Sequence, residues 1–108
     1  MEPHTPDDQY LYLTTTGWKS GQAHQIEIWY VMHSGRYYLV AEMGERAHWV
    51  QNIRRDPAIR ARVGSLKFTG TGRTVDRAAE PELATVVAAL MDAKYDWSDG
   101  LIVELTPV

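Results

Sequence analysis

The chain of 108 residues contains no cysteine, and this absence excludes several kinds of chemistry at once. Disulfide bonds, thiolate nucleophiles, cysteine-ligated zinc and iron–sulfur clusters all need a residue that the sequence lacks. A long hydrophobic run is missing as well. The longest, residues 86–91, is far shorter than the roughly 20 residues that a helix needs to cross a bilayer. The first eight residues, MEPHTPDD, contain no apolar signal segment, so we expect no membrane span and a cytoplasmic location.

Positive charge is also scarce. The chain carries 11 Lys and Arg against 14 Asp and Glu, which gives a formal net charge of −3. Proteins bind nucleic acids largely by neutralising phosphates, so this balance argues against a nucleic-acid partner. The four histidines share no spacing typical of metal ligands, and we predict no metal site. No catalytic side chain can be assigned from the sequence.

Phenylalanine occurs once, whereas there are 4 Trp and 6 Tyr. Rings with a polar atom suit half-buried surfaces, where one edge packs and the other reaches water, a ligand or a partner. The length fits one domain, and the 44% of hydrophobic residues is ordinary for a globular protein. We therefore expect residues 1–8 to form a flexible tail and residues 9–108 to form a single domain.

The spacing of hydrophobic residues predicts a mainly β, α+β fold with the element order βββαββαβ. Two helices are expected, at residues 46–55 and 80–94, the second with a buried stripe that includes Val86. The first three strands should form an antiparallel meander, and the whole should form a small barrel or a strongly curved sheet. The six expected strands are residues 9–16, 24–32, 36–41, 59–63, 66–75 and 101–105.

Two segments carry groups that could bind a ligand. The loop over residues 14–21, TTTGWKSG, offers four hydroxyls, one ammonium group and glycines that could free backbone N–H groups for an anion. The alternative is an ordinary polar hairpin loop. On the first helix, Trp49 and Asn52 are three residues apart and could stack on and hydrogen-bond to a planar heterocycle. The alternative is that Trp49 anchors the core and Asn52 is solvated.

These segments resemble those of a known family. Residues 13–22, LTTTGWKSGQ, are similar to the LTTTGRKSGQ signature of deazaflavin-dependent nitroreductases and quinone reductases. These enzymes belong to the flavin-binding split β-barrel superfamily, which is related to pyridoxamine 5'-phosphate oxidase. Residues 48–57, HWVQNIRRDP, resemble the WxxNLxxxP helix of that family. Weaker matches follow in order, so the resemblance covers roughly residues 11–107.

The resemblance implies a six-stranded split β-barrel with two helices, usually a homodimer, with a flavin-like cofactor near the subunit interface. The cofactor would be coenzyme F420 or FMN, and the reaction would be hydride transfer to a small-molecule acceptor such as a quinone or a nitroaromatic compound. Tyr95 and Trp97 are expected on the substrate side of the pocket. The expected cofactor-binding residues are Thr16, Trp18, Lys19, Ser20, Gly21, Ala41, Glu42, Met43, Trp49 and Asn52.

Four positions depart from the family pattern. Trp18 replaces an Arg, His24 replaces a residue that is often basic, Glu42 replaces a common Ser, and Met43 replaces a frequent Lys. Fewer cations weaken the case for the long anionic tail of F420, and FMN, with its single phosphate, suits such a site better. Two alternatives to an enzyme therefore stay open. One is a cofactor-binding or carrier module without turnover, and the other is a dimeric barrel that has lost its site.

Overall fold

The structure, a computed structural model, describes residues 9–17 and 20–108, so the expected tail over residues 1–8 lies outside the described residues. A short 3-10 helix, η1 (Gly44–Arg46), precedes the first α-helix. The two α-helices are α1 (His48–Arg55) and α2 (Pro81–Tyr95). The strands are β1 (Tyr10–Thr16), β2 (Ala23–Trp29), β3 (Val31–His33), β4 (Arg36–Ala41), β5 (Ala58–Val63), β6 (Leu66–Val75) and β7 (Leu101–Pro107).

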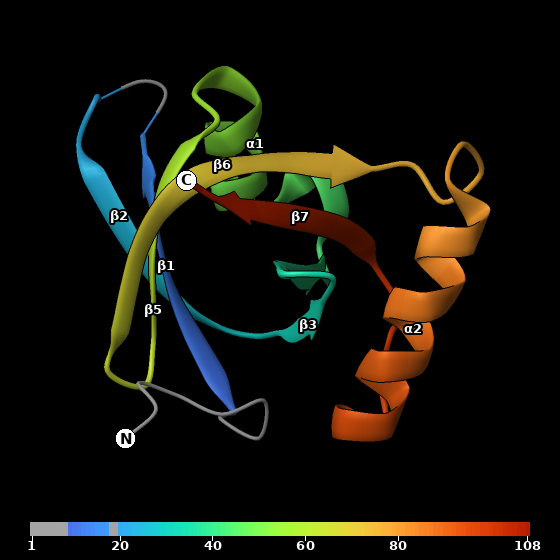
Figure 1. Cartoon of the computed structure of the whole chain (residues 1–108). Helices are drawn as coiled ribbons and strands as arrows, with labels where there is room; N and C mark the ends of the chain where they lie inside the picture. The colour runs from blue at the N-terminus through green and yellow to red at the C-terminus, as the bar shows by residue number, and fades with distance from the viewer. Residues whose placement is uncertain (1–8, 18–19) are drawn as a thin grey trace.

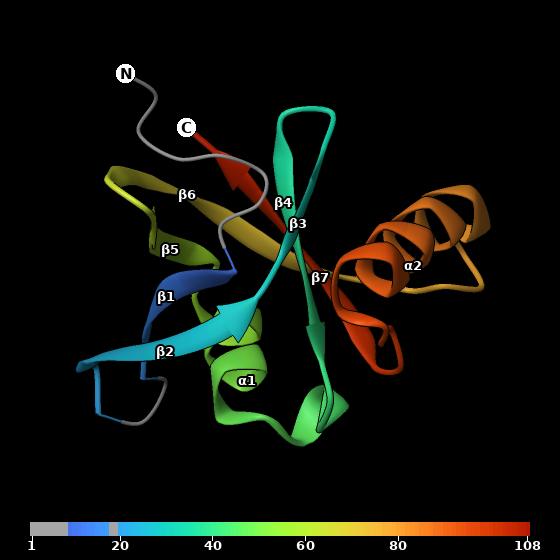
Figure 2. The ribbon, with the colours of Figure 1, turned by 90° about the horizontal axis from the view of Figure 1, so that it is seen from below.

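All seven strands belong to one antiparallel sheet with the order β2-β1-β5-β6-β7-β4-β3 (Figure 1). Strands β2 and β3 occupy the two opposite edges of this sheet, although only Tyr30 separates them in the chain. The sheet must therefore curl until its edges almost meet, and it forms a half-barrel (Figure 2). The mainly β, α+β fold with two helices is confirmed.

The prediction of six strands is wrong, because the structure divides residues 24–32 into two strands at Tyr30. On one side of this corner β2 pairs with β1, and on the other β3 pairs with β4, which turns the expected meander into two hairpins at opposite edges. Tyr30 is fully buried and lies between the two ladders, so its backbone N–H and C=O need partners other than a neighbouring strand. Side chains of α2 satisfy them: the Tyr30 N–H donates to the Tyr95 hydroxyl (3.1 Å), and Lys94 Nζ donates to the Tyr30 oxygen (3.1 Å).

The main core fills the inside of the curl. Inward-facing residues of the strands, Leu11, Leu13, Leu39 and Leu105 among them, are fully buried there. Helix α1 lies against this interior and adds Val50 and Ile53, so its apolar stripe closes one end of the half-barrel (Figure 2). This placement puts Trp49 and Asn52 of α1 beside the β1–β2 connection.

A second, smaller core lies outside the curl, where α2 packs on β3, β4 and β7. Val87 and Met91 of α2 are fully buried against Tyr38 and Ile102. The prediction that Val86 belongs to the buried stripe of α2 is wrong, because this side chain is 37% exposed. None of the helices in the described part of the chain is long and apolar enough to cross a membrane.

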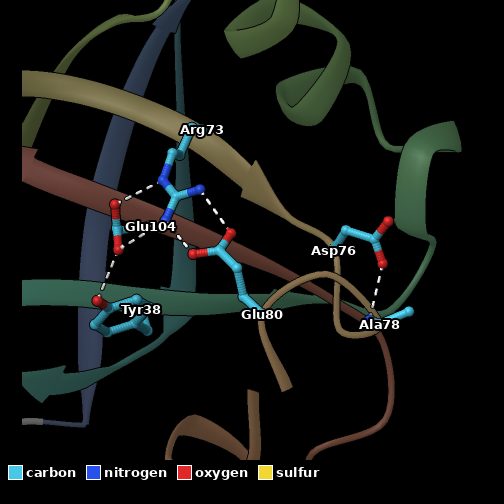
Figure 3. Close-up of polar contacts among 6 residues, drawn as sticks. All are labelled: Tyr38, Arg73, Asp76, Ala78, Glu80 and Glu104. Carbon is cyan, nitrogen blue, oxygen red and sulfur yellow. Dashed lines mark hydrogen bonds and ion pairs between the residues drawn. The ribbon is translucent and has the colours of Figure 1, made fainter. Parts of the chain in front are cut away.

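A polar cluster fastens the start of α2 to the sheet (Figure 3). Glu104 of β7, whose side chain is only 7% exposed, accepts hydrogen bonds from the Tyr38 hydroxyl and from Arg73 Nε, both at 2.8 Å. The other two guanidinium nitrogens of Arg73 donate to both carboxylate oxygens of Glu80 at 2.8 and 2.9 Å. Because Glu80 directly precedes the first residue of α2, this double ion pair ties the helix to β6 and β7. We call these four residues the clamp.

Electrostatics reinforce the clamp. Burial alone would raise the pKa of Glu104, but the hydrogen bonds from Arg73 and Tyr38 outweigh it and hold the pKa below its ordinary value. The hydrogen bonds from Arg73 likewise lower the pKa of Glu80. Burial and the bond to Glu104 raise the pKa of Tyr38 to about 12. Both carboxylates are therefore ionised and Tyr38 is neutral at neutral pH.

Candidate functional site

A pocket of about 460 Å³ lies between the β1–β2 connection and α1. This volume falls in the range of about 300–1,000 Å³ that is typical of sites for small molecules and cofactors. A larger hollow of about 710 Å³ exists on the outer face of β1, β5 and β6, and Thr14 is the one residue of the two motifs that lines it. The smaller one is the candidate cofactor pocket, because both motifs reach it. Its lining residues are Thr15, Gly17, Ser20, His24, Gln25, Ile26, His48, Trp49, Gln51 and Asn52.

Helix α1 forms one wall. Its core side carries Val50 and Ile53, which leaves Trp49 half-buried, packed against the core and also facing the pocket. Asn52 is 5% exposed, so the alternative of a solvated amide is wrong. Its Nδ2 donates to Thr15 Oγ1 at 3.0 Å, which ties α1 to β1. Asn52 thus fixes the wall on which Trp49 stands.

The β1–β2 connection forms the opposite wall, and much of its hydrogen bonding is internal. The Gly17 N–H donates to the Gln22 oxygen and the Gly21 N–H to the Gly17 oxygen, both at 2.7 Å. The Gln22 N–H donates to Ser20 Oγ at 3.2 Å. These three N–H groups are therefore not free for an anion, which corrects the expectation that the glycines release backbone donors. Gly21 closes this turn with a φ of +71°, a conformation that favours glycine.

Gly17 lets two side chains approach the backbone closely. A Cβ atom at this position would lie 2.8 Å from both His24 Nε2 and Ser20 Oγ. The imidazole and the hydroxyl thus gather over Gly17, and both line the pocket. One hydroxyl and one imidazole at one end, with an indole at the other, suit a planar ligand that carries an anionic group. The pocket thus combines a volume in the range of small-molecule sites with groups that suit a planar, anionic ligand.

The structure brings together only part of the predicted cofactor-binding set. Ser20, Trp49 and Asn52 line the pocket, and Gly21 belongs to the same turn without lining it. Trp18 and Lys19 lie outside the described residues. Thr16 lines a separate hollow on the outer side of the sheet.

The remaining predicted residues lie elsewhere. Ala41 is buried in the core at the end of β4, and Glu42 and Met43 follow it as exposed residues that do not line the pocket. Tyr95 and Trp97 belong to the second core, between α2 and the sheet, which we call the outer core. The Tyr95 ring stacks on Trp29 with centroids 4.5 Å apart, and the Trp97 ring meets Trp29 edge-on at 6.2 Å.

Two pocket residues with useful chemistry escaped the sequence-based site, His24 and His48. Imidazole is the side chain that most readily gains or loses a proton near neutral pH, so both widen what the pocket can do. Each lies within a few residues of a predicted motif, His24 after the loop and His48 directly before Trp49. Their closeness to these motifs could have indicated both residues. The spacing between the two histidines gives no such indication.

Comparisons with solved structures confirm the fold. A structure described as an F420-H2 dependent reductase is 24% identical, with 89% of this chain and 92% of that chain covered and a TM-score of 0.61. An FAD-binding protein from Mesorhizobium loti is 12% identical, with 95% and 83% covered and a TM-score of 0.74. A structure described as a domain-swapped dimer is 22% identical, with 94% and 81% covered and a TM-score of 0.63. At these identities the likeness shows the fold alone.

A search of curated proteins finds no match. A family model is more informative, because it matches residues 4–100, nearly the whole chain, and is described as the F420H(2)-dependent quinone reductases. The matched range contains the loop, α1 and all of the residues that line the candidate cofactor pocket. The chain therefore belongs to the F420H(2)-dependent quinone reductase family.

Proposed function

We propose that this protein is a small oxidoreductase that binds coenzyme F420, or FMN in its place, in the candidate cofactor pocket. Its substrate would be a small acceptor such as a quinone or a nitroaromatic compound. Family membership supports a flavin or deazaflavin oxidoreductase. The observation that carries the proposal is that two motifs far apart in the sequence, the loop with Ser20 and the helix with Trp49, line one pocket of suitable size.

The two walls have different tasks. Ser20 and His24, gathered over Gly17, would face the anionic part of the cofactor, together with Lys19, which lies outside the described residues. Trp49 would lie against the planar ring. Asn52 acts as a positioning residue, because its hydrogen bond to Thr15 holds α1, and with it Trp49, against β1.

The cofactor, when bound, supplies hydride transfer, and the protein supplies orientation and exclusion of water. Reduction of a quinone carbonyl also needs a proton at the oxygen. His24 and His48 are the pocket residues with an imidazole, a side chain that can act as a general acid toward this oxygen. No covalent nucleophile is required.

We further propose that two copies form a homodimer. The candidate cofactor pocket lies at β2, an edge strand, and a domain of 108 residues has little interior for a ligand of flavin size. A second copy would cover the open side of the pocket. The solved structure described as a domain-swapped dimer supports this proposal, because it has the same fold.

A titration and a turnover assay test the proposal. Purified protein is titrated with F420 and with FMN, and binding is followed by the absorbance of the ring. The reduced cofactor is then supplied with a quinone and with a nitroaromatic compound. We expect binding in the micromolar range or tighter, and oxidation of the cofactor that requires the protein.

The two alternatives predict other results. A carrier module would bind the cofactor without accelerating reduction of either acceptor. A barrel with a lost site would bind neither F420 nor FMN, which would contradict the proposed function.

A further inference from the structure

The outer face of β1, β5 and β6 gathers three cationic side chains. The strand register pairs Tyr12 with Arg62 and Arg62 with Lys67, and it pairs Thr14 with Arg60 and Arg60 with Thr69. Residues that pair across strands, and residues two apart along one strand, point to the same side of a sheet. Arg60, Arg62 and Lys67 therefore stand next to one another on one face. We call it the basic face.

Neither α-helix of the described residues covers this face. Helix α1 lies against the interior of the curl, and α2 packs on β3, β4 and β7 (Figure 2). The face is hollowed instead: it carries the 710 Å³ pocket, which all three cations line together with Tyr12, Thr14 and Thr69. Thr14 and Thr69, which the register pairs with Arg60, add hydroxyl donors for an anion.

No ion pair between described residues involves these cations. Arg62 lies over the Tyr12 ring, with its guanidinium carbon 4.3 Å from the centroid, and donates to the Gly64 oxygen at 3.2 Å. No described carboxylate forms an ion pair with Arg60 or Lys67. Glu27, the carboxylate in the same cross-strand row, accepts a hydrogen bond from the Tyr12 hydroxyl at 2.8 Å.

The register places like charges directly opposite each other. Arg62 and Lys67 are paired across two neighbouring strands, and like charges in such a pair repel. Arg60 adds a third positive charge in the neighbouring row. In a chain with a net charge of −3, this local excess is the opposite of the overall balance. A ligand with several negative charges would relieve the repulsion.

We propose that the basic face binds a ligand segment that carries two or more phosphate or carboxylate groups. Arg60 and Lys67 would bind it directly, with Thr14 and Thr69 as hydroxyl donors and Arg62 as a charge held in place by Tyr12. The proposal does not require the proposed function, but the two sites are connected, because Gln25 lines both pockets. The segment is therefore either the anionic tail of a ligand seated in the candidate cofactor pocket or a free small polyanion.

Inorganic tripolyphosphate is the probe for the face itself. The full chain is titrated while backbone amide shifts are followed by NMR, and the titration is repeated for the double variant Arg60→Gln/Lys67→Gln. The matched control is Arg36→Gln/Arg46→Gln, which removes two exposed cations that do not line this pocket. We expect saturable shifts at Thr14, Arg60 and Thr69, and a dissociation constant about tenfold higher in the first variant alone.

Absence of saturable binding, or equal weakening in both double variants, would overturn the proposal. Thermal melts of all three proteins show whether a variant has lost its fold. Should Arg60→Gln/Lys67→Gln be unfolded, the single variant Lys67→Gln replaces it, with Arg46→Gln as control and a smaller expected loss of about threefold.

Competition then identifies the source of the negative charge. Displacement of tripolyphosphate by F420, which has a long anionic tail, but not by FMN, assigns the face to a cofactor tail. Displacement by neither supports a free polyanion and leaves the binding site intact. If FMN, with its single phosphate, displaces tripolyphosphate as well as F420 does, the proposal that the ligand needs several negative charges is contradicted. The proposed function fails separately, if neither cofactor binds anywhere.

Discussion

At the scale of single residues, two glycines show how close contacts shape this protein in different ways. At Gly17 a Cβ atom would meet the far ends of two side chains, His24 Nε2 and Ser20 Oγ, both at 2.8 Å. At Gly70 of β6 a Cβ atom would lie 2.2 Å from the backbone oxygen of Thr106 in β7. Side chains can rotate away, whereas a paired strand cannot, so the same substitution has different consequences at the two sites.

We predict that Gly17→Ala leaves the fold intact but weakens cofactor binding. Its φ is not positive, so alanine meets no backbone strain, and the free energy of unfolding should change by less than about 1 kcal/mol. Displacement of His24 and Ser20 should raise the dissociation constant of the bound cofactor about fivefold or more. Urea unfolding and ring absorbance measure the two quantities.

Gly70→Ala is the matched control, because its main expected effect is on the free energy of unfolding rather than on cofactor binding. It should lower the free energy of unfolding by about 2 kcal/mol or more, because β6 and β7 must separate locally. A Gly17→Ala protein that binds F420 and FMN as the wild type does would show that the groups over Gly17 do not contact the cofactor.

At the scale of elements, the clamp joins α2 to the sheet, and its charges make that junction sensitive to acid. Arg73 is 49% exposed, while Glu104 is 7% exposed, so loss of Arg73 leaves a buried carboxylate without its ionic partner. We predict that Arg73→Gln lowers the free energy of unfolding at neutral pH by about 1–2 kcal/mol. Urea unfolding followed by circular dichroism measures it.

The pH dependence has a definite sign. The folded-state pKa values of Glu104 and Glu80 lie below the ordinary value of 4.5, so the clamp stabilises the fold above that pH. Its contribution disappears as the pH falls through the lowered values, and the difference between wild type and Arg73→Gln should shrink there.

Arg54→Gln is the matched control, since Arg54 is 48% exposed and pairs with Glu45, which is itself 63% exposed. This pair should contribute about 0–1 kcal/mol. Equal losses in the two variants, or a difference that persists in acid, would contradict the account of the clamp.

Much of the element order could be predicted from the sequence, because periodicity reports local burial. The strand over residues 66–75 has the predicted bounds, and both helices were found within a few residues. The break at Tyr30 could not be predicted, since residues 24–32 are apolar enough to continue as one strand. What ends β2 is the choice of partner strand and the pairing of Tyr30 with Tyr95 and Lys94, which are long-range contacts.

The same limit applies to the site. Trp49 and the loop residue Ser20 could be predicted, because their motifs are recognisable in the sequence, and the structure brings them to one pocket. The internal hydrogen bonds of Gly17 and Gly21 depend on the exact turn, which residue types do not specify. Strand alternation predicts that Arg60 and Arg62 face one side of their strand, with Lys67 on the neighbouring strand. Their exact pairing with one another and with β1 depends on the register, which a single sequence does not reveal.

At the scale of the whole molecule, β2 and β3 are the two edge strands of the half-barrel that the described residues form, and the candidate cofactor pocket lies at β2. We predict that the protein sediments as a homodimer, with a mass near twice the 12.3 kDa of one chain. Sedimentation equilibrium with and without F420 measures this mass. A mass near 12.3 kDa under both conditions would contradict the dimer.

The location of the cofactor is the central claim, and tryptophan fluorescence tests it most directly. A flavin or deazaflavin ring in contact with an indole quenches its emission, so binding should quench Trp49 most strongly. Trp97 is the matched control, since it is also half-buried but belongs to the outer core. The measurement is the fraction of emission lost on saturation with F420 or FMN in the wild type, Trp49→Phe and Trp97→Phe. We predict that Trp49→Phe loses most of the quenching and that Trp97→Phe retains it. Equal quenching in Trp49→Phe and wild type would place the cofactor elsewhere and contradict the account.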